Sequence, residues 1–231
     1  MTSLRSLFEQ ADALLLDFDG PVCALFAGYS AQEIANEIRS LLDGHSNRLH
    51  ERLKRGPDPL QLVRWTAENA PRLLPTVEQA LAQAECRATE SAVPTPHADD
   101  LIRVTAKSGC PVVMVSNNSA QAIAQYLKTH ELAQHVNSVI GRDPLRPDRM
   151  KPDPWPVLQA ASAAGARPSR CLLVGDSPTD IEAARKAGAA SIGYAKRESR
   201  VRELSDAGAD IVIESMALVA EAAGSLRGVR P

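Results

Sequence analysis

Two carboxylates, Asp17 and Asp19, directly follow a short apolar run near the start of the sequence. The run covers residues 13–16 and is closed by Gly20 and Pro21, which is typical of a buried strand that ends in a turn. Two acids separated by one residue repel each other unless a cation lies between them. The spacing therefore indicates a site for a hard metal ion with oxygen ligands, usually Mg²⁺. The alternative is an ordinary turn, because Asp and Gly are common turn residues.

A second pair of acids, Asp176 and Asp180, lies in the segment Gly-Asp-Ser-Pro-Thr-Asp after another apolar run. Capping of the following helix explains an acid at the first position, but it does not require another acid four residues later. A carboxylate from this segment, added to the first pair, would make a three-acid magnesium site that a phosphate oxygen completes. We therefore expect the strands that end at Leu16 and Val174 to be neighbours.

Ser116, Asn117 and Lys151 offer groups that stabilise an anion. Ser116 and Asn117 follow an apolar run and precede a helix, where a hydroxyl and free backbone N–H groups favour negative charge; a plain helix N-cap is the alternative. Lys151 stands in Met-Lys-Pro-Asp-Pro, where Pro152 restricts its backbone. Its ammonium group is either an ordinary surface charge or the partner of a carboxylate and a phosphate.

Alternating strands and helices must bring these groups together. We expect strands at residues 13–16, 111–115, 138–140, 171–174, 190–193 and 210–213, and helices at 98–107, 119–130, from 153, 178–187, 200–207 and 215–223. This alternation predicts an α/β fold, a Rossmann-like doubly wound parallel sheet. The polar residues follow strands or precede helices, so they converge on the edge where such sheets bind ligands.

Residues 23–93 interrupt this pattern with a helical block that contains no convincing strand. Apolar residues repeat at helical spacing in 34–42 and 77–84, and two further helices are expected at 45–55 and 58–70. Asp58 is the expected N-cap of the last of these, with Pro59 in its first turn. Pro94-Thr95-Pro96 reads as a stiff linker. The expected domains are a core of residues 1–22 and 94–231 and an inserted all-α domain of residues 23–93.

Composition narrows the class of ligand. The chain has 231 residues, a net charge of −2 and only 3% aromatic residues, which argues against a nucleic-acid surface. Neither a signal peptide nor the roughly 20 consecutive apolar residues of a membrane span are found, so we expect a cytoplasmic protein without a membrane partner. Four scattered cysteines without a CxxC pair indicate neither a zinc site nor a disulfide framework. A small molecule is the expected ligand, and the oligomeric state stays open.

The segments Asp17-Phe-Asp-Gly, Ser116-Asn, Lys151-Pro-Asp-Pro and Gly175-Asp-Ser-Pro-Thr-Asp resemble, in order and spacing, the four motifs of the haloacid dehalogenase-like hydrolase superfamily. The resemblance extends from residue 12 to about residue 193 and is to phosphoglycolate phosphatase-like members. The helical block is similar to the first-type cap domain of that family. The resemblance implies a phosphatase that uses Mg²⁺ and acts on a small phosphorylated metabolite.

The same resemblance implies two catalytic roles. Asp17 would be the nucleophile that accepts the phosphoryl group as an aspartyl phosphate. Asp19 would protonate the leaving alcohol and then deprotonate the attacking water. Relatives that cleave carbon–halogen bonds or phosphonates lack an acid at this position, so phosphoryl transfer from an ester fits better.

The implied binding residues come from all four motifs. The metal ion would be held by Asp17, Asp176 and the main-chain carbonyl of Asp19. Ser116, the amide of Asn117 and Lys151 would hold the phosphate. Asp180 would not bind the metal ion directly but would hold Lys151, or a water molecule bound to the metal ion, in place.

Two alternative functions stay open at this point. A sugar phosphomutase of the same fold would share these motifs, although such mutases usually carry threonine and histidine shortly after the first motif, where this chain has Cys23-Ala-Leu-Phe-Ala-Gly-Tyr. A non-catalytic relative that acts as a binding protein is the other alternative. Pro21 is the only departure that favours it, since the family usually has threonine there and proline removes a hydroxyl and an N–H group.

The helical block offers two further expectations. Arg48, Arg52 and Arg55 fall at helical spacing and either attract a second anionic group or form a solvated face. If the block closes over the site, its tethers near residues 23–28 and 93–97 would act as hinges.

Overall fold

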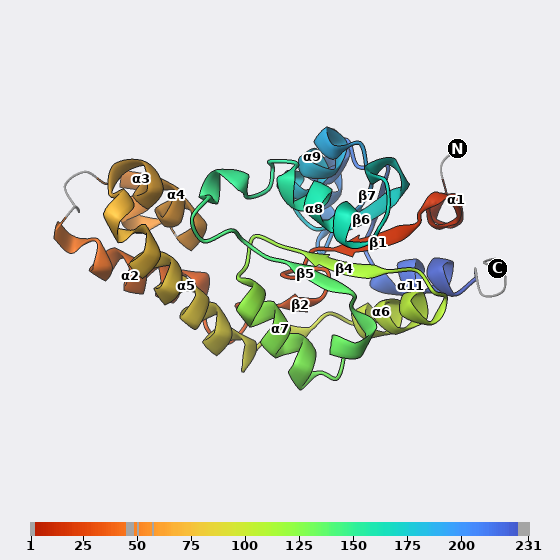
Figure 1. Ribbon diagram of the computed structural model, residues 1–231, viewed down its shortest axis with the longest axis horizontal. Coiled ribbons are helices and arrows are strands. Elements are labelled where there is room, and N and C mark those ends of the chain that lie inside the picture. The colour runs from red at the N-terminus through yellow and green to blue at the C-terminus, as the bar shows by residue number, and fades with distance from the viewer. Residues whose placement is uncertain (1–2, 45–48, 50, 57, 226–231) are drawn as a thin grey trace.

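The computed structural model describes residues 3–44, 49, 51–56 and 58–225 (Figure 1). Within these residues a six-stranded parallel sheet has the order β5-β4-β1-β6-β7-β8. Its strands are β1 (Ala13–Leu16), β4 (Val112–Val115), β5 (Ser138–Ile140), β6 (Cys171–Gly175), β7 (Ala190–Tyr194) and β8 (Ile211–Ile213). The predicted α/β Rossmann-like core is therefore confirmed.

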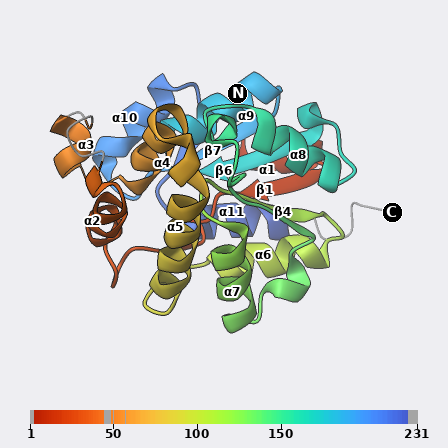
Figure 2. The same cartoon turned by 60° about the vertical axis from the view of Figure 1, so that its left-hand side comes forward.

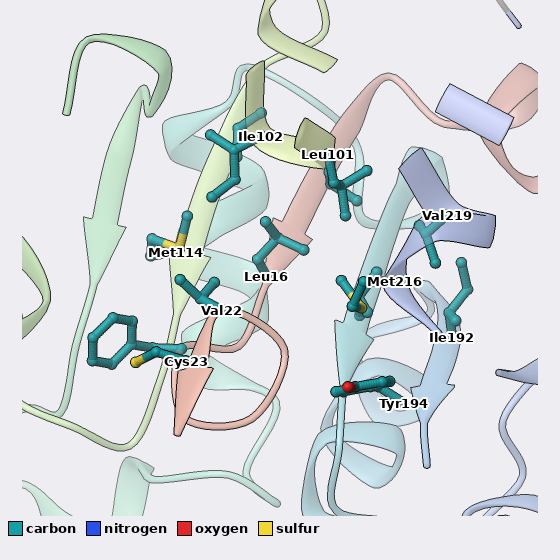
Figure 3. Close-up of a cluster of buried hydrophobic side chains, with 14 of the residues drawn as sticks. Leu16, Val22, Cys23, Leu101, Ile102, Met114, Ile192, Tyr194, Met216 and Val219 are labelled. Atoms are coloured by element: carbon teal, nitrogen blue, oxygen red, sulfur yellow. The ribbon is translucent and has the colours of Figure 1, made fainter. Parts of the chain in front are cut away.

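Both faces of the sheet are covered by helices, as in other parallel sheets. These helices are α1 (Leu4–Gln10), α6 (Ala98–Lys107), α7 (Ala120–Thr129), α8 (Trp155–Ala163), α9 (Pro178–Ala187), α10 (Glu198–Asp206) and α11 (Met216–Gly224). Leu14 and Leu16 of β1 face a core shared with α1, α6, α7 and α11, part of which Figure 3 shows. Ala13 and Leu15 face the opposite core, shared with α8 and α9. Because both faces are buried, β1 is apolar at every position.

The helical block lies beside the sheet (Figure 1). It contains α2 (Ala31–Leu41), α3 (Glu51–Arg55), α4 (Pro59–Asn69) and α5 (Leu74–Thr89). These helices have a hydrophobic core of their own, which includes Ile34, Leu62 and Leu81. Asp58 is the N-cap of α4, as predicted, and its Oδ1 accepts a hydrogen bond of 2.9 Å from the N–H of Leu60.

The expectation of no strand in residues 23–93 is wrong at both ends of that range. The strands β2 (Cys23–Ala24) and β3 (Val93–Pro94) pair antiparallel, with Cys23 opposite Pro94. Each strand has only two residues, too few for an alternating pattern to appear in the sequence. The two tethers of the helical block are therefore joined side by side, and Pro94 belongs to a strand as well as to the expected linker.

Some features of the helical block lie outside the described residues. Residues 45–48 and 50 of the expected helix 45–55 are among them. Of the three arginines expected to share one helix face, Arg48, Arg52 and Arg55, only the side chain of Arg55 is described, and it is exposed.

Helix α1, with Ser3 as N-cap, was not predicted. In the part of the chain that is described, no helix is both long and apolar enough to cross a membrane.

Candidate active site

Strands β1 and β6 are neighbours, as the two acidic motifs predicted. Leu16 is in register with Val174, and the N–H of Asp17 donates a hydrogen bond of 2.9 Å to the carbonyl of Val174. On the other side of β1, Leu16 is in register with Met114 of β4. The carboxyl ends of these three adjacent strands therefore carry the candidate residues of three motifs.

Lys151 extends from the loop between β5 and α8 into this edge of the sheet. Its side chain is only 2% exposed, and Nζ lies 2.9 Å from Oδ1 of Asp17 and 2.5 Å from Oδ1 of Asp180. Nζ also donates a hydrogen bond of 2.8 Å to the carbonyl of Val115. Asn117 fixes the lysine backbone, because its Oδ1 accepts from Lys151 N and its Nδ2 donates to Lys151 O. The interpretation of Lys151 as an ordinary surface lysine is therefore wrong.

Asp17, Asp176 and Asp180 each present a carboxylate oxygen, and these oxygens lie within 4.8 Å of one another. Two glycines make this approach possible. A Cβ on Gly20 would lie 2.3 Å from Oδ2 of Asp176, and a Cβ on Gly175 would lie 2.3 Å from Cβ of Asp180. A group of carboxylate oxygens at this spacing fits the ligand preference of Mg²⁺.

Asp19 is held in a different way from the other acids. Its Oδ1 accepts a hydrogen bond of 3.0 Å from the N–H of Leu25, which follows strand β2. The expected contribution of Asp19 to the metal site is its main-chain carbonyl, which stays a prediction.

Burial sets the electrostatics of the acids. It raises the pKa of Asp17 to about 7, against the attraction of Lys151 and with further increases from the charges of Asp180 and Asp176. Burial also raises the pKa of Asp176 to about 6, which Lys196 opposes from 3.3 Å, and it raises the pKa of Asp19. Buried acids with raised pKa values favour a cation that compensates their charge.

Lys151 remains positively charged among these acids. Burial lowers its pKa, but the neighbouring charges of Asp17 and Asp180 outweigh burial, so the pKa lies above its ordinary value. The site therefore combines an ammonium group with two carboxylates that favour its charged form.

The loop of residues 116–119, hereafter the 116–119 loop, connects β4 to α7. The Ser116 hydroxyl donates a hydrogen bond of 3.0 Å to Oδ1 of Asn118. Helix α7 has Ser119 as its N-cap, so the interpretation of Ser116 or Asn117 as a plain N-cap is wrong. The Ser116 hydroxyl also accepts a hydrogen bond of 3.3 Å from the N–H of Asn118, so it is held within the loop at the wall of the cavity described below.

Asp180 has two partners, one for each carboxylate oxygen. Ser177 is the N-cap of α9, and Oδ2 of Asp180 accepts a hydrogen bond of 3.0 Å from the Ser177 N–H in a capping box. Its Oδ1 faces Lys151. The sequence pattern suggested that capping does not involve the second acid, whereas Asp180 both completes the cap and pairs with Lys151.

The candidate residues line a single cavity of about 390 Å³. The sequence-predicted residues that line it are Asp17, Asp19, Ser116, Asn117, Lys151, Asp176 and Asp180. The helical block adds Phe26, Asp58, Leu60 and Glu85. Sequence reasoning missed Glu85 and Asn118. A usable signal for Glu85 was its position among the apolar residues Leu81, Ala84 and Ala88 of α5.

Residues 11–188 match the family model of the haloacid dehalogenase-like hydrolases. The chain belongs to this family. It is 37% identical over 106 residues to phosphoglycolate phosphatase of Salmonella typhimurium, a match that covers 46% of this chain and 41% of that protein. The match thus spans about two fifths of the length of that relative.

Solved structures show the same fold. CbbY from Rhodobacter sphaeroides, in complex with phosphate, has a TM-score of 0.67 at 19% identity and aligns with 90% of this chain and 95% of its own. A HAD family hydrolase from Deinococcus radiodurans, with bound phosphate and sodium, has a TM-score of 0.61 at 24% identity, with coverages of 95% and 98%. At these identities the likeness extends to the fold alone.

Proposed function

We propose that this protein is a Mg²⁺-dependent phosphatase that hydrolyses a small phosphate monoester through an aspartyl phosphate on Asp17. The observation that carries this proposal is the buried contact of Lys151 with Asp17 and Asp180 inside a cavity that Ser116 also lines. An ammonium group beside a carboxylate nucleophile offsets the repulsion between that carboxylate and an incoming phosphate.

In the first half-reaction, an oxygen of Asp17 attacks phosphorus and the bond from phosphorus to the alcohol oxygen breaks. Asp19 donates its proton to the departing alkoxide. Burial raises the pKa of Asp19, which favours the protonated form needed for this step. The Leu25 N–H fixes the orientation of the carboxyl group.

In the second half-reaction, water attacks the phosphorus of the aspartyl phosphate and Asp19 takes a proton from that water. Inorganic phosphate leaves and the carboxylate of Asp17 is restored. Splitting hydrolysis into these two displacements lets the same acid serve first as general acid and then as general base.

The proposed metal ligands are Asp17, Asp176 and the main-chain carbonyl of Asp19. A bound Mg²⁺ would neutralise negative charge on the transferring group. Ser116, the amide of Asn117 and Lys151 would bind the phosphate. The contact of Asp180 with Lys151 supports its role in orienting the ammonium group.

We assign residues 23–93 as a cap domain that encloses the leaving group, with Phe26, Asp58 and Leu60 at the cavity wall. The substrate is a small phosphorylated metabolite, and phosphoglycolate is the first compound to test because relatives bear the name phosphoglycolate phosphatase.

The test measures phosphate release from p-nitrophenyl phosphate and a panel of phosphorylated metabolites with and without Mg²⁺. We expect release that needs Mg²⁺ and no bisphosphate activator, and background activity for Asp17→Asn. Equal turnover by Asp17→Asn would contradict the proposed nucleophile. A strict need for a bisphosphate would indicate a mutase instead.

A further inference from the structure

Three buried charged residues join helix α5 to the segment that follows β5. The side chains of Arg142, Glu78 and Glu85 are 1%, 4% and 1% exposed. Arg142 Nε donates to both carboxylate oxygens of Glu78, at 3.1 and 2.9 Å, and Nη1 donates to Oε1 of Glu85 at 3.0 Å. Both acids lie on the same face of α5, seven residues apart.

Glu85 also contacts the 116–119 loop directly. Its Oε1 accepts a hydrogen bond of 3.1 Å from Nδ2 of Asn118, and its Oε2 accepts one of 2.8 Å from the N–H of Ser119. The Asn118 amide in turn has its Oδ1 against the hydroxyl of Ser116. A chain of hydrogen bonds therefore runs from α5 to the hydroxyl that we assign to phosphate binding.

Arg142 also holds the 116–119 loop by two hydrogen bonds of its own. Its Nη1 donates a hydrogen bond of 2.6 Å to the carbonyl of Asn117, and its backbone N–H donates one of 2.9 Å to the carbonyl of Asn118. Gly141 permits this approach, because a Cβ there would lie 2.4 Å from the backbone nitrogen of Ala120.

Helix α5 also packs along α7, which starts at the end of this loop (Figure 1, Figure 2). Gln125 of α7 donates hydrogen bonds to the carbonyl of Cys86 and to Oγ1 of Thr89, at 3.1 and 2.8 Å. The C-terminal half of α5 is thus attached to the core at several points.

We propose that Glu85 is a positioning residue for phosphate binding. Together with Arg142 it holds the 116–119 loop in its binding form, so the seating of α5 on the core and the binding of phosphate favour each other. This coupling is reciprocal by thermodynamic linkage. The inference rests on the proposed phosphatase function, since it takes the 116–119 loop as the phosphate site.

The different hydrogen bonds of Glu85 and Glu78 make Glu85→Gln and Glu78→Gln a matched pair of test and control variants. Each oxygen of Glu85 accepts from two donors, namely Asn118 and Arg142 at Oε1 and Ser119 and Arg142 at Oε2. In Glu85→Gln the amide NH₂ faces two of these donors in either orientation. Among the described residues, Glu78 accepts hydrogen bonds only from Nε of Arg142, so Glu78→Gln keeps an acceptor for it.

The first experiment measures the dissociation constant of inorganic phosphate in the presence of Mg²⁺, and KM and kcat for p-nitrophenyl phosphate. For Glu85→Gln we expect the dissociation constant and KM to rise by about tenfold or more, within the usual range of coupling between sites, and kcat to change much less. Glu78→Gln, which keeps an acceptor for Arg142, should change both constants much less than Glu85→Gln does. Equal constants for the two variants would overturn the inference.

The second experiment needs no variant and decides the matter if Glu85→Gln does not fold. Hydrogen exchange of the wild-type protein is compared with and without inorganic phosphate, Mg²⁺ being present in both. We expect phosphate to slow exchange in residues 81–89 of α5. If phosphate binds without this protection, the inference about Glu85 is overturned and the proposed phosphatase function is not affected. If wild-type protein neither binds phosphate nor hydrolyses p-nitrophenyl phosphate, the proposed function itself is overturned.

Discussion

Gly20 lies so close to Asp176 that a Cβ at position 20 would come within 2.3 Å of the carboxylate oxygen Oδ2. Gly20 also has a φ of +120°, which L side chains rarely adopt. The turn after the first acidic pair is therefore shaped around an acid that lies more than 150 residues later in the chain. Glycine is needed here both for its backbone conformation and for the space it leaves.

Gly20→Ala is expected to displace Asp176 and abolish most magnesium-dependent activity. Gly109→Ala is the matched control, because Gly109 also has a positive φ, +77°, but a Cβ there would meet nothing within 4 Å. The control should lose only about 1 kcal/mol of stability from backbone strain and keep its activity. Phosphate release and urea unfolding of both variants check this, and a fully active Gly20→Ala would contradict it.

Lys151→Met removes the ammonium group between the buried carboxylates of Asp17 and Asp180. Because breaking a buried ion pair leaves uncompensated charge, we expect a loss of about 3–5 kcal/mol in the free energy of unfolding, together with loss of activity. Lys54→Met should change stability by less than about 0.5 kcal/mol, since the side chains of its ion pair with Glu51 are 40% and 76% exposed. Similar losses in the two variants would argue against a structural charge at position 151.

Magnesium should stabilise the protein through the buried acids. A ligand at 100 times its dissociation constant adds about 2.7 kcal/mol, which for a chain of this size corresponds to a rise in Tm of roughly 5–10 °C. Asp176→Asn should greatly reduce this rise, and removal of Mg²⁺ with EDTA should reverse it in wild type. Asp99→Asn, an exposed acid of α6, should respond like wild type. The measurement is thermal unfolding with and without Mg²⁺.

The stability difference between wild type and Glu78→Gln should depend on pH, because Glu78 is a buried acid. Burial raises its pKa above the ordinary value of 4.5, the charges of Glu85 and Asp143 add to the rise, and Arg142 opposes it. The folded protein therefore binds this proton more tightly than the unfolded chain does. The resulting stability is fully present below pH 4.5 and is lost as the pH rises through the folded pKa.

Glutamine at position 78 does not titrate, so the stability of Glu78→Gln relative to wild type should increase as the pH rises from 4.5 through the folded pKa of Glu78. Urea unfolding of both proteins at several pH values measures this difference. A difference that decreases with pH would show that the attraction of Arg142 outweighs burial at this position.

The sequence was sufficient for the sheet and for the meeting of its acids, because the apolar runs before Asp17 and Asp176 are short, buried on both faces and followed directly by carboxylates. The neighbouring positions of β1 and β6 followed from the chemistry of those acids. The pairing of β2 with β3 could not be predicted from the sequence, because two residues per strand are too few to show an alternation of apolar and polar residues.

The contacts of Glu85 could not be predicted for another reason. An acid on the apolar face of α5 indicates that some buried partner exists, but Arg142 and Asn118 reach it from segments more than 30 residues away in the chain. The contacts of Asp180 were also only partly predictable. This residue both caps helix α9 through Ser177 and pairs with Lys151, and the sequence pattern suggested only the contact with Lys151.

The shared arginine has a consequence for protein engineering. A chimera that receives the helical block of a relative would leave Arg142 buried without its two acids unless the donor supplies carboxylates at the matching positions of α5. Substrate preference is therefore best exchanged by moving the whole helical block together with Arg142, because the other helices of the block share a hydrophobic core with α5.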